Sequence, residues 1–183
     1  MSGAAVQQNI FEEKSVWKIL LRIAPPVMLA QLIQAMYNIV DSYFVGRFSE
    51  DGLTALSVVY PIQLIAIAVA VGTGVGVNTL MSRHYAHQEQ RRANETAGTG
   101  VVLALGSWAL FALLSVLLMR PYVLLSTGAA AAVEYAVTYG TIVCVGSIGL
   151  FLESIWTKVH QARGNMRLPM LAQIAGALTN IVL

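Results

Sequence analysis

The chain has 183 residues, of which 57% are hydrophobic types and 11% are charged. A soluble globular domain carries about 25% charged residues, so this composition excludes a soluble domain and indicates an integral membrane protein. The net charge of +2 and the single cysteine, Cys144, exclude a nucleic-acid partner and a disulfide within the chain. No catalytic constellation or metal-ligand spacing is present, so we expect no enzyme, no cofactor and no structural metal.

Five charge-free segments mark the expected membrane-crossing helices. A crossing needs about 20 mostly apolar residues. With their flanks, the segments predict helices over residues 17–45, 52–83, 93–120, 133–158 and 167–183. The last charge-free segment has 16 residues, which cover about 24 Å against a hydrocarbon core of about 30 Å. The sequence therefore predicts an all-α integral membrane protein with four complete helices and one partial helix.

The basic residues are distributed unevenly between the two sides of these helices. Nine of the 11 Lys and Arg residues fall in the N-terminal flank, the second linker and the fourth linker, and the other two are Arg47 and Arg120. Basic residues concentrate in cytoplasmic loops. We therefore expect a multi-pass protein of the plasma (inner) membrane, in contact with membrane lipid and with its N-terminus in the cytoplasm.

The first predicted helix carries its polar side chains on one face. At 100° per residue, six polar groups fall within an arc of about 140°. Unpaired polar groups in hydrocarbon cost several kcal/mol, so this polar stripe is predicted to face other helices or a wet cavity. Its acid is either an ion or proton site or an interfacial group near the outer end of the helix. The stripe consists of Gln31, Gln34, Tyr37, Asn38, Asp41 and Ser42.

Other residues of the predicted helices suggest roles in packing or in bending. Pro25 and Pro26 remove backbone donors from the first helix, which predicts a kink that is either a hinge or a static bend. Gly72 and Gly76 form a small-xxx-small pair, which predicts close helix packing.

Two further polar residues lie in the fourth and fifth predicted helices. Glu153 is interpreted as an interfacial acid in preference to a buried relay. Asn180 needs hydrogen-bond partners in hydrocarbon, which either helix contacts or a cavity would provide.

Three stretches resemble the multidrug and toxic compound extrusion (MATE) transporters. NIVDSYFVGRFSEDGLTALSVVYPIQ (38–63) resembles the first helix and outer turn of that family. VGTGVGVNTLMSR (71–83) resembles the end of its second helix, and GNMRLPMLAQIAGALTNIVL (164–183) the start of its fifth. The likeness covers nearly the whole chain and marks the family better than its DinF-like branch.

The resemblance implies a cation-coupled antiporter that exports amphipathic, often cationic organic compounds through two six-helix lobes. It implies that Asp41 is the carboxylate that couples to H⁺ or Na⁺, with Asn180 in the same cation-coupling site. Sodium at Asp41 would be the only metal. It also implies the family's bend at Pro25 or Pro26. The residues expected to line the site for small organic cations are Gln34, Tyr37, Asn38 and Tyr139.

By this likeness, residues 1–183 are expected to form part of the N-terminal lobe, with the C-terminal lobe absent. Transport would then need that missing half or a second chain. Two other functions stay open: a lipid-linked sugar flippase of the same superfamily, and a non-transporting membrane fragment or scaffold. No Lys or Arg lies inside a charge-free segment, which weighs against an anionic substrate.

Overall fold

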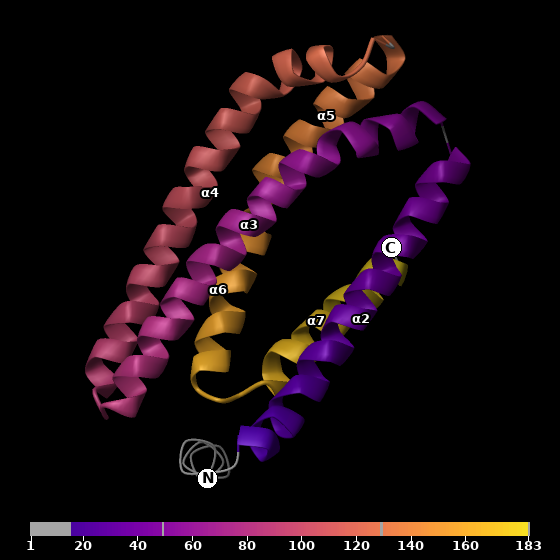
Figure 1. Cartoon of the computed structure of the whole chain (residues 1–183). Coiled ribbons are helices and arrows are strands. Elements are labelled where there is room, and N and C mark those ends of the chain that lie inside the picture. The colour runs from indigo at the N-terminus through magenta and orange to yellow at the C-terminus, as the bar shows by residue number, and fades with distance from the viewer. Residues whose placement is uncertain (1–15, 49, 129, 183) are drawn as a thin grey trace.

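The computed structural model describes residues 16–48, 50–128 and 130–182, and every element in these ranges is an α-helix (Figure 1). The all-α fold predicted from the sequence is confirmed. In chain order the helices are α2 (Val16–Phe48), α3 (Glu50–Ala86), α4 (Gln90–Ser126), α5 (Ala130–Gly146), α6 (Ile148–Ala162) and α7 (Arg167–Val182).

Three helical stretches of the described chain are long and apolar enough to cross a membrane. They are Gly52–Ala86, Gln90–Ser126 and Ala132–Ala162, the last of which combines α5 and α6. The 33 residues of α2 extend over about 50 Å at 1.5 Å per residue, and the 16 residues of α7 over about 24 Å. Four complete crossings therefore remain a prediction.

The helices form a block and a pair. α3, α4, α5 and α6 pack on one another as the block, whereas α2 packs mainly on α7 as the pair. Figure 1 shows the pair standing beside the block, with the α6–α7 connection near the N-terminal end of α2. The chain therefore leaves the block after α6 and returns to the first helix.

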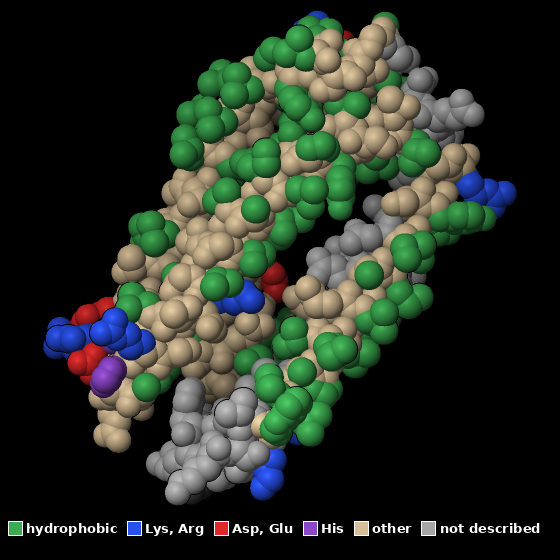
Figure 2. Space-filling model, viewed as in Figure 1, with side chains coloured by type: hydrophobic (Ala, Val, Ile, Leu, Met, Phe, Trp, Pro, Cys, Tyr) green, Lys and Arg blue, Asp and Glu red, His purple; other side chains and the backbone are tan. Residues whose placement is uncertain are grey.

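The core of the block is built from small and medium apolar side chains. Phe151 and Ile155 of α6 are 1% exposed, and they cluster with Ala66, Ala70 and Met81 of α3. Lipid tails are as apolar as leucine, so close packing of small residues holds helices together in a bilayer. Large apolar side chains instead cover much of the outer surface in Figure 2, as contact with hydrocarbon requires.

Gly74 sets the close approach of α3 to α6. A Cβ added at Gly74 would lie 2.8 Å from Cγ of Lys158 and 3.3 Å from the backbone oxygen of Ser154. No described atom lies within 4 Å of a Cβ added at Gly72 or Gly76, and both are exposed. Among the described residues the close contact with α6 is therefore made by Gly74, which lies about 200° around the helix from Gly72, and the packing role of Gly72 and Gly76 stays a prediction.

The predicted fourth helix is divided in two. The sequence predicts one helix over 133–158, whereas the structure has a turn at Ser147 between α5 and α6. Ser147 Oγ donates to the Cys144 carbonyl at 2.7 Å, and Trp108 Nε1 of α4 donates to the Val145 carbonyl at 3.0 Å. These bonds satisfy carbonyls beside the break, as backbone groups in hydrocarbon require.

Prolines lie within three of the long helices. α2 is helical without a break across Pro25 and Pro26. Pro61 lies in α3 and Pro121 in α4. Figure 1 shows that both helices bend near the end of the block that is farther from the α6–α7 connection. Proline removes one backbone hydrogen bond and crowds the preceding turn, which accounts for such bends.

Candidate functional site

One face of α6 is densely polar. Glu153, Ser154, Thr157, Lys158 and Gln161 recur at intervals of three or four residues, which brings them to one side of a helix. The adjoining side carries core residues of the block, so packing fixes the rotation of α6. The polar face of α6 is thereby turned towards the pair.

This face of α6 lines a cavity of about 220 Å³ between the block and the pair. Gln31 comes from α2 and Gln173 from α7, while α3 contributes only the apolar Ile67 and Val71. Figure 2 shows this hollow beside α2, with acidic and basic side chains at its wall. The apolar remainder of the wall is Val27, Leu150, Met166, Pro169 and Met170.

Hydrogen bonds fix the polar face of α6 in two directions. Towards α3, Ser154 Oγ donates to the Ala70 carbonyl at 2.9 Å, and Asn78 Nδ2 donates to the Lys158 carbonyl at 2.8 Å. Along the cavity wall, Thr157 Oγ1 donates to Glu153 Oε1 at 2.6 Å. Lys158 Nζ donates to Gln161 Oε1 at 3.2 Å.

Glu153 and Lys158 are not paired with each other. No ion pair within the described ranges involves either side chain. Both side chains are partly buried. The cavity therefore holds a carboxylate and an ammonium, each held by one neutral neighbour, in place of a closed salt bridge.

The described side chains place only some of the predicted site residues. Gln31 of the polar stripe lines the cavity. Ser42 and Pro25 are exposed on α2. The side chains of the remaining predicted residues on α2 and α7 lie outside the described residues; they are Pro26, Gln34, Tyr37, Asn38, Asp41 and Asn180.

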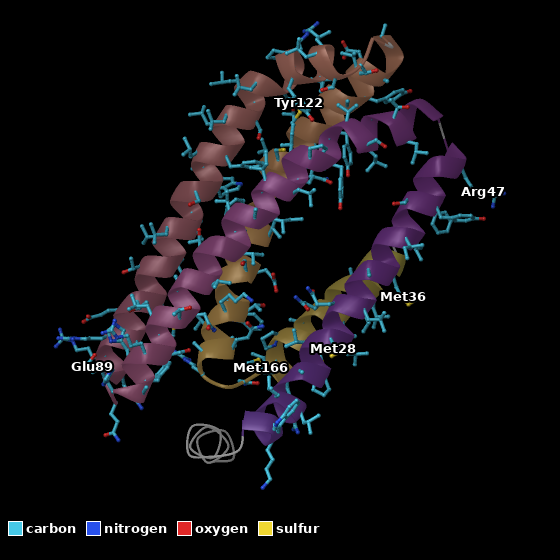
Figure 3. The ribbon with its side chains drawn as sticks, in the orientation of Figure 1. Met28, Met36, Arg47, Glu89, Tyr122 and Met166 are labelled. Carbon is cyan, nitrogen blue, oxygen red and sulfur yellow. The ribbon has the colours of Figure 1, made fainter. Side chains whose placement is uncertain are left out.

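Backbone positions nevertheless relate Asp41 to Asn180. α7 packs along α2, and the C-terminal end of α7 lies beside the part of α2 between the labelled Met36 and Arg47 (Figures 1 and 3). Asp41 falls within that part of α2, and Asn180 lies in the last turn of α7. The two positions are therefore at similar levels of adjacent helices.

Tyr139 occupies a different place from the cavity. It lies on α5, and its hydroxyl accepts a hydrogen bond from Gln63 Nε2 of α3 at 3.3 Å. It is partly buried against the core of the block and is not among the residues that line the cavity. The structure thus unites Gln31 with the α6 face and places Tyr139 between α3 and α5.

Sequence reasoning missed the cavity-facing role of two charged residues. Glu153 was expected at the interface, and Lys158 in a cytoplasmic linker, yet both side chains line the cavity. Their recognisable signal is the spacing of the polar residues of α6, which match one helical face. Counting charge-free runs hides this signal, because a charged residue is then treated as the end of a span.

A second polar cluster lies where α3 meets α4. His84 Nδ1 and Glu89 Oε2 are 2.8 Å apart, and Arg92 Nη1 donates to Glu89 Oε1 at 3.2 Å. The hydrogen bond from His84, more than the nearby charge of Arg92, holds the pKa of Glu89 below its ordinary 4.5. Arg163, just after α6, reaches the same end of the block and donates to the Tyr85 hydroxyl at 3.1 Å.

Comparison with known proteins gives family and fold matches. A sequence profile of the MatE family matches residues 26–183. Structural alignments with three solved transporters each cover 100% of this chain. A MOP superfamily transporter from Pyrococcus furiosus Vc1, whose binding pocket of reverse polarity suggests a different function, has a TM-score of 0.91, 23% identity and 39% of its own length covered.

The other two solved structures are similar in extent. An outward-facing multidrug resistance MATE transporter of the MOP superfamily has a TM-score of 0.90, 22% identity and 40% of its length covered. A MATE in complex with Br-NRF has a TM-score of 0.84, 22% identity and 41% of its length covered. No match is found among curated proteins. The chain thus spans about 40% of the length of these transporters.

Proposed function

We propose, since this chain belongs to the MatE family of membrane transporters, that it forms part of the N-terminal lobe of a cation-coupled antiporter. Its substrates would be amphipathic, often cationic organic compounds. The observation that carries the proposal is the polar cavity between block and pair, in a chain that matches the family over residues 26–183. Neither helix packing nor membrane insertion requires a carboxylate, an ammonium and two glutamines on one cavity wall.

The coupling group in this proposal is Asp41. Protonation or Na⁺ binding at Asp41, beside Asn180, would change the hydration and packing of α2 around Pro25 and Pro26. A cationic drug held beside Gln34, Tyr37, Asn38 and Tyr139 would then be released. Support comes from Gln31, the first member of the same stripe, which lines the cavity, and from the similar levels of Asp41 and Asn180 on adjacent helices.

The arrangement of the protein in its membrane is part of the proposal. The 9-to-2 distribution of basic residues favours a cytoplasmic N-terminus in the plasma (inner) membrane. Alternating access moves one repeat against the other. The chain is therefore expected to work with a C-terminal lobe or a second chain.

The test is ion-driven export in everted vesicles that carry the protein together with a C-terminal lobe, where export is measured as drug uptake into the lumen. Asp41→Asn should abolish efflux driven by a pH or Na⁺ gradient, because an amide cannot exchange the coupling ion. Membrane insertion should be unchanged. Asp41→Glu, which keeps a titratable carboxylate, should retain part of the activity. Undiminished efflux in Asp41→Asn would contradict the coupling role, and separate pH and Na⁺ gradients identify the ion.

A further inference from the structure

The cavity wall carries two opposite charges that point in different directions. Glu153 and Lys158 are five residues apart on α6, which separates them by about 140° around the helix. They cannot stack above each other as residues at i and i+4 do. This spacing explains why the described structure has no ion pair between them although both face one cavity.

Each charge is held in place by its surroundings. Thr157 donates to one carboxylate oxygen of Glu153 at 2.6 Å, and no side chain in the described part of the structure bonds to the other oxygen. The stem of Lys158 lies against α3, where its Cγ would be 2.8 Å from a Cβ at Gly74. Gln161 accepts one of the three hydrogen-bond donors of the Lys158 ammonium at 3.2 Å. Within the described residues, both charged groups are thus oriented and keep further capacity for hydrogen bonds.

Electrostatics decides which ligand such a wall prefers. Partly buried charges interact strongly because solvent screens them poorly, and each gains most from a counter-charge. A ligand with a single charge satisfies one group and leaves the other uncompensated. A ligand that carries both an ammonium and a carboxylate can satisfy Glu153 and Lys158 together.

We propose that Glu153 and Lys158 form a two-point recognition site for amphipathic zwitterions. Glu153 binds the ligand's ammonium, and Lys158 binds its carboxylate. The volume of about 220 Å³ is below the roughly 300–1,000 Å³ of drug-sized pockets, so the cavity takes the charged end of the ligand. Apolar neighbours such as Leu150 and Met170 contact the adjoining body. The inference rests on the proposed function and specifies its substrate class.

Binding of three matched ligands tests this proposal. The ligands share one aromatic body and are a zwitterionic amino acid, its methyl ester with only the ammonium, and its N-acetyl form with only the carboxylate. Affinities are measured by titration calorimetry on the purified protein in lipid nanodiscs without an ion gradient. The unmodified protein should bind the zwitterion most tightly.

Two variants that each remove one charge should separate the two contacts. Glu153→Gln should lower the affinity for the zwitterion and for the ester about tenfold, which corresponds to the loss of one charge-assisted hydrogen bond. The affinity for the N-acetyl form should be unchanged. Lys158→Gln should lower the affinity for the zwitterion and for the N-acetyl form about tenfold and leave the affinity for the ester unchanged. Glu134→Gln and Arg120→Gln, at exposed positions that do not line the cavity, should alter none of the three.

Several outcomes would overturn the proposal. An equal loss of affinity for all three ligands in each variant would mean that the two residues only support the fold. Tightest binding of the N-acetyl form by the unmodified protein would indicate an anionic substrate, and tightest binding of the ester a simple cation. If both single variants misfold, the charge-exchanged variant Glu153→Lys/Lys158→Glu, which keeps both charges, must still prefer the zwitterion.

This result is independent of the coupling test. Binding is measured at equilibrium, so loss of the role proposed for Asp41 would leave the selectivity of Glu153 and Lys158 in place. Conversely, efflux that depends on Asp41 with no selectivity among the three ligands would uphold the antiporter and reject the zwitterion site.

Discussion

Gly74 illustrates how one missing side chain sets the distance between two helices. A Cβ at this position would meet the Lys158 stem at 2.8 Å and the Ser154 carbonyl oxygen at 3.3 Å. The sequence shows three glycines spaced two residues apart, Gly72, Gly74 and Gly76, and both faces of α3 can be read as the packing face. Only the position of α6 shows that Gly74 makes this contact, so the sequence alone could not single it out.

Gly74→Ala and Gly72→Ala form a matched pair of variants. Either change gains about 1 kcal/mol of helix propensity in a helix interior. At Gly74 the added methyl group also overpacks the contact with α6, at a cost of about 1–3 kcal/mol. We expect Gly74→Ala to lower the free energy of unfolding relative to Gly72→Ala by that cost, measured by denaturant titration in detergent micelles. Equal stabilities would show that α6 moves away freely.

Glu89 is a charged residue whose contribution to stability depends on pH. Gln88 beside it has φ of 60°, a strained conformation for a residue with a Cβ, and the Glu89 backbone N–H donates to the His84 carbonyl at 2.9 Å. The hydrogen bond of the Glu89 carboxylate with His84 and its ion pair with Arg92 therefore support a strained turn between α3 and α4.

The turn should loosen in acid. Because the pKa of Glu89 is lowered on folding, the unfolded chain binds its proton more readily than the folded turn. The contribution to stability is thus complete above the ordinary value of 4.5 and is lost as the pH falls through the lower folded pKa. At such acidic pH, hydrogen exchange corrected for intrinsic rates should show less protection of the turn amides. Glu89→Gln should remove this pH dependence, and a dependence that persists would assign it elsewhere.

At the scale of elements, composition predicts the helical crossing around Ser147 but not the break between α5 and α6 at that residue. Residues 135–152 carry no charge, so the whole run satisfies the requirement for a crossing. The break lies inside that run because side chains, and not the helix backbone, satisfy the carbonyls of Cys144 and Val145. One of those donors is Trp108, 37 residues earlier in the chain, which no local pattern indicates.

Trp108→Phe tests this long-range contact. The variant keeps an aromatic ring and loses the N–H that donates to the Val145 carbonyl at 3.0 Å. An unsatisfied carbonyl costs about 1–3 kcal/mol where water cannot replace the donor. We expect that loss in the free energy of unfolding. Trp17→Phe, at a position 76% exposed, is the control. A loss no larger than the control's would mean that water or lipid replaces the indole.

The whole molecule divides into a packed block and a helix pair, and the sequence predicts its parts better than this arrangement. Spacing and composition are enough for the helical class, and of the predicted polar stripe the described side chains place Gln31 at the cavity. The pairing of α2 with α7 joins residues more than a hundred positions apart, so no periodicity records it. The cavity follows from that pairing, and with it the roles of Glu153 and Lys158.

The pair should move relative to the block when a ligand binds in the cavity. α2 and α7 pack mainly on each other, and interfaces between such rigid units change by hinge or shear motion. Spin labels at Met28 of α2 and Gln88 beside α3, both exposed, should report a distance change of several ångströms with the zwitterionic ligand. Gln88 with Ile142 inside the block, and Met28 with Leu171 inside the pair, are the controls and should stay constant. Equal changes in all three distances would mean that the lobe deforms throughout and that the cavity does not lie on a boundary between rigid units.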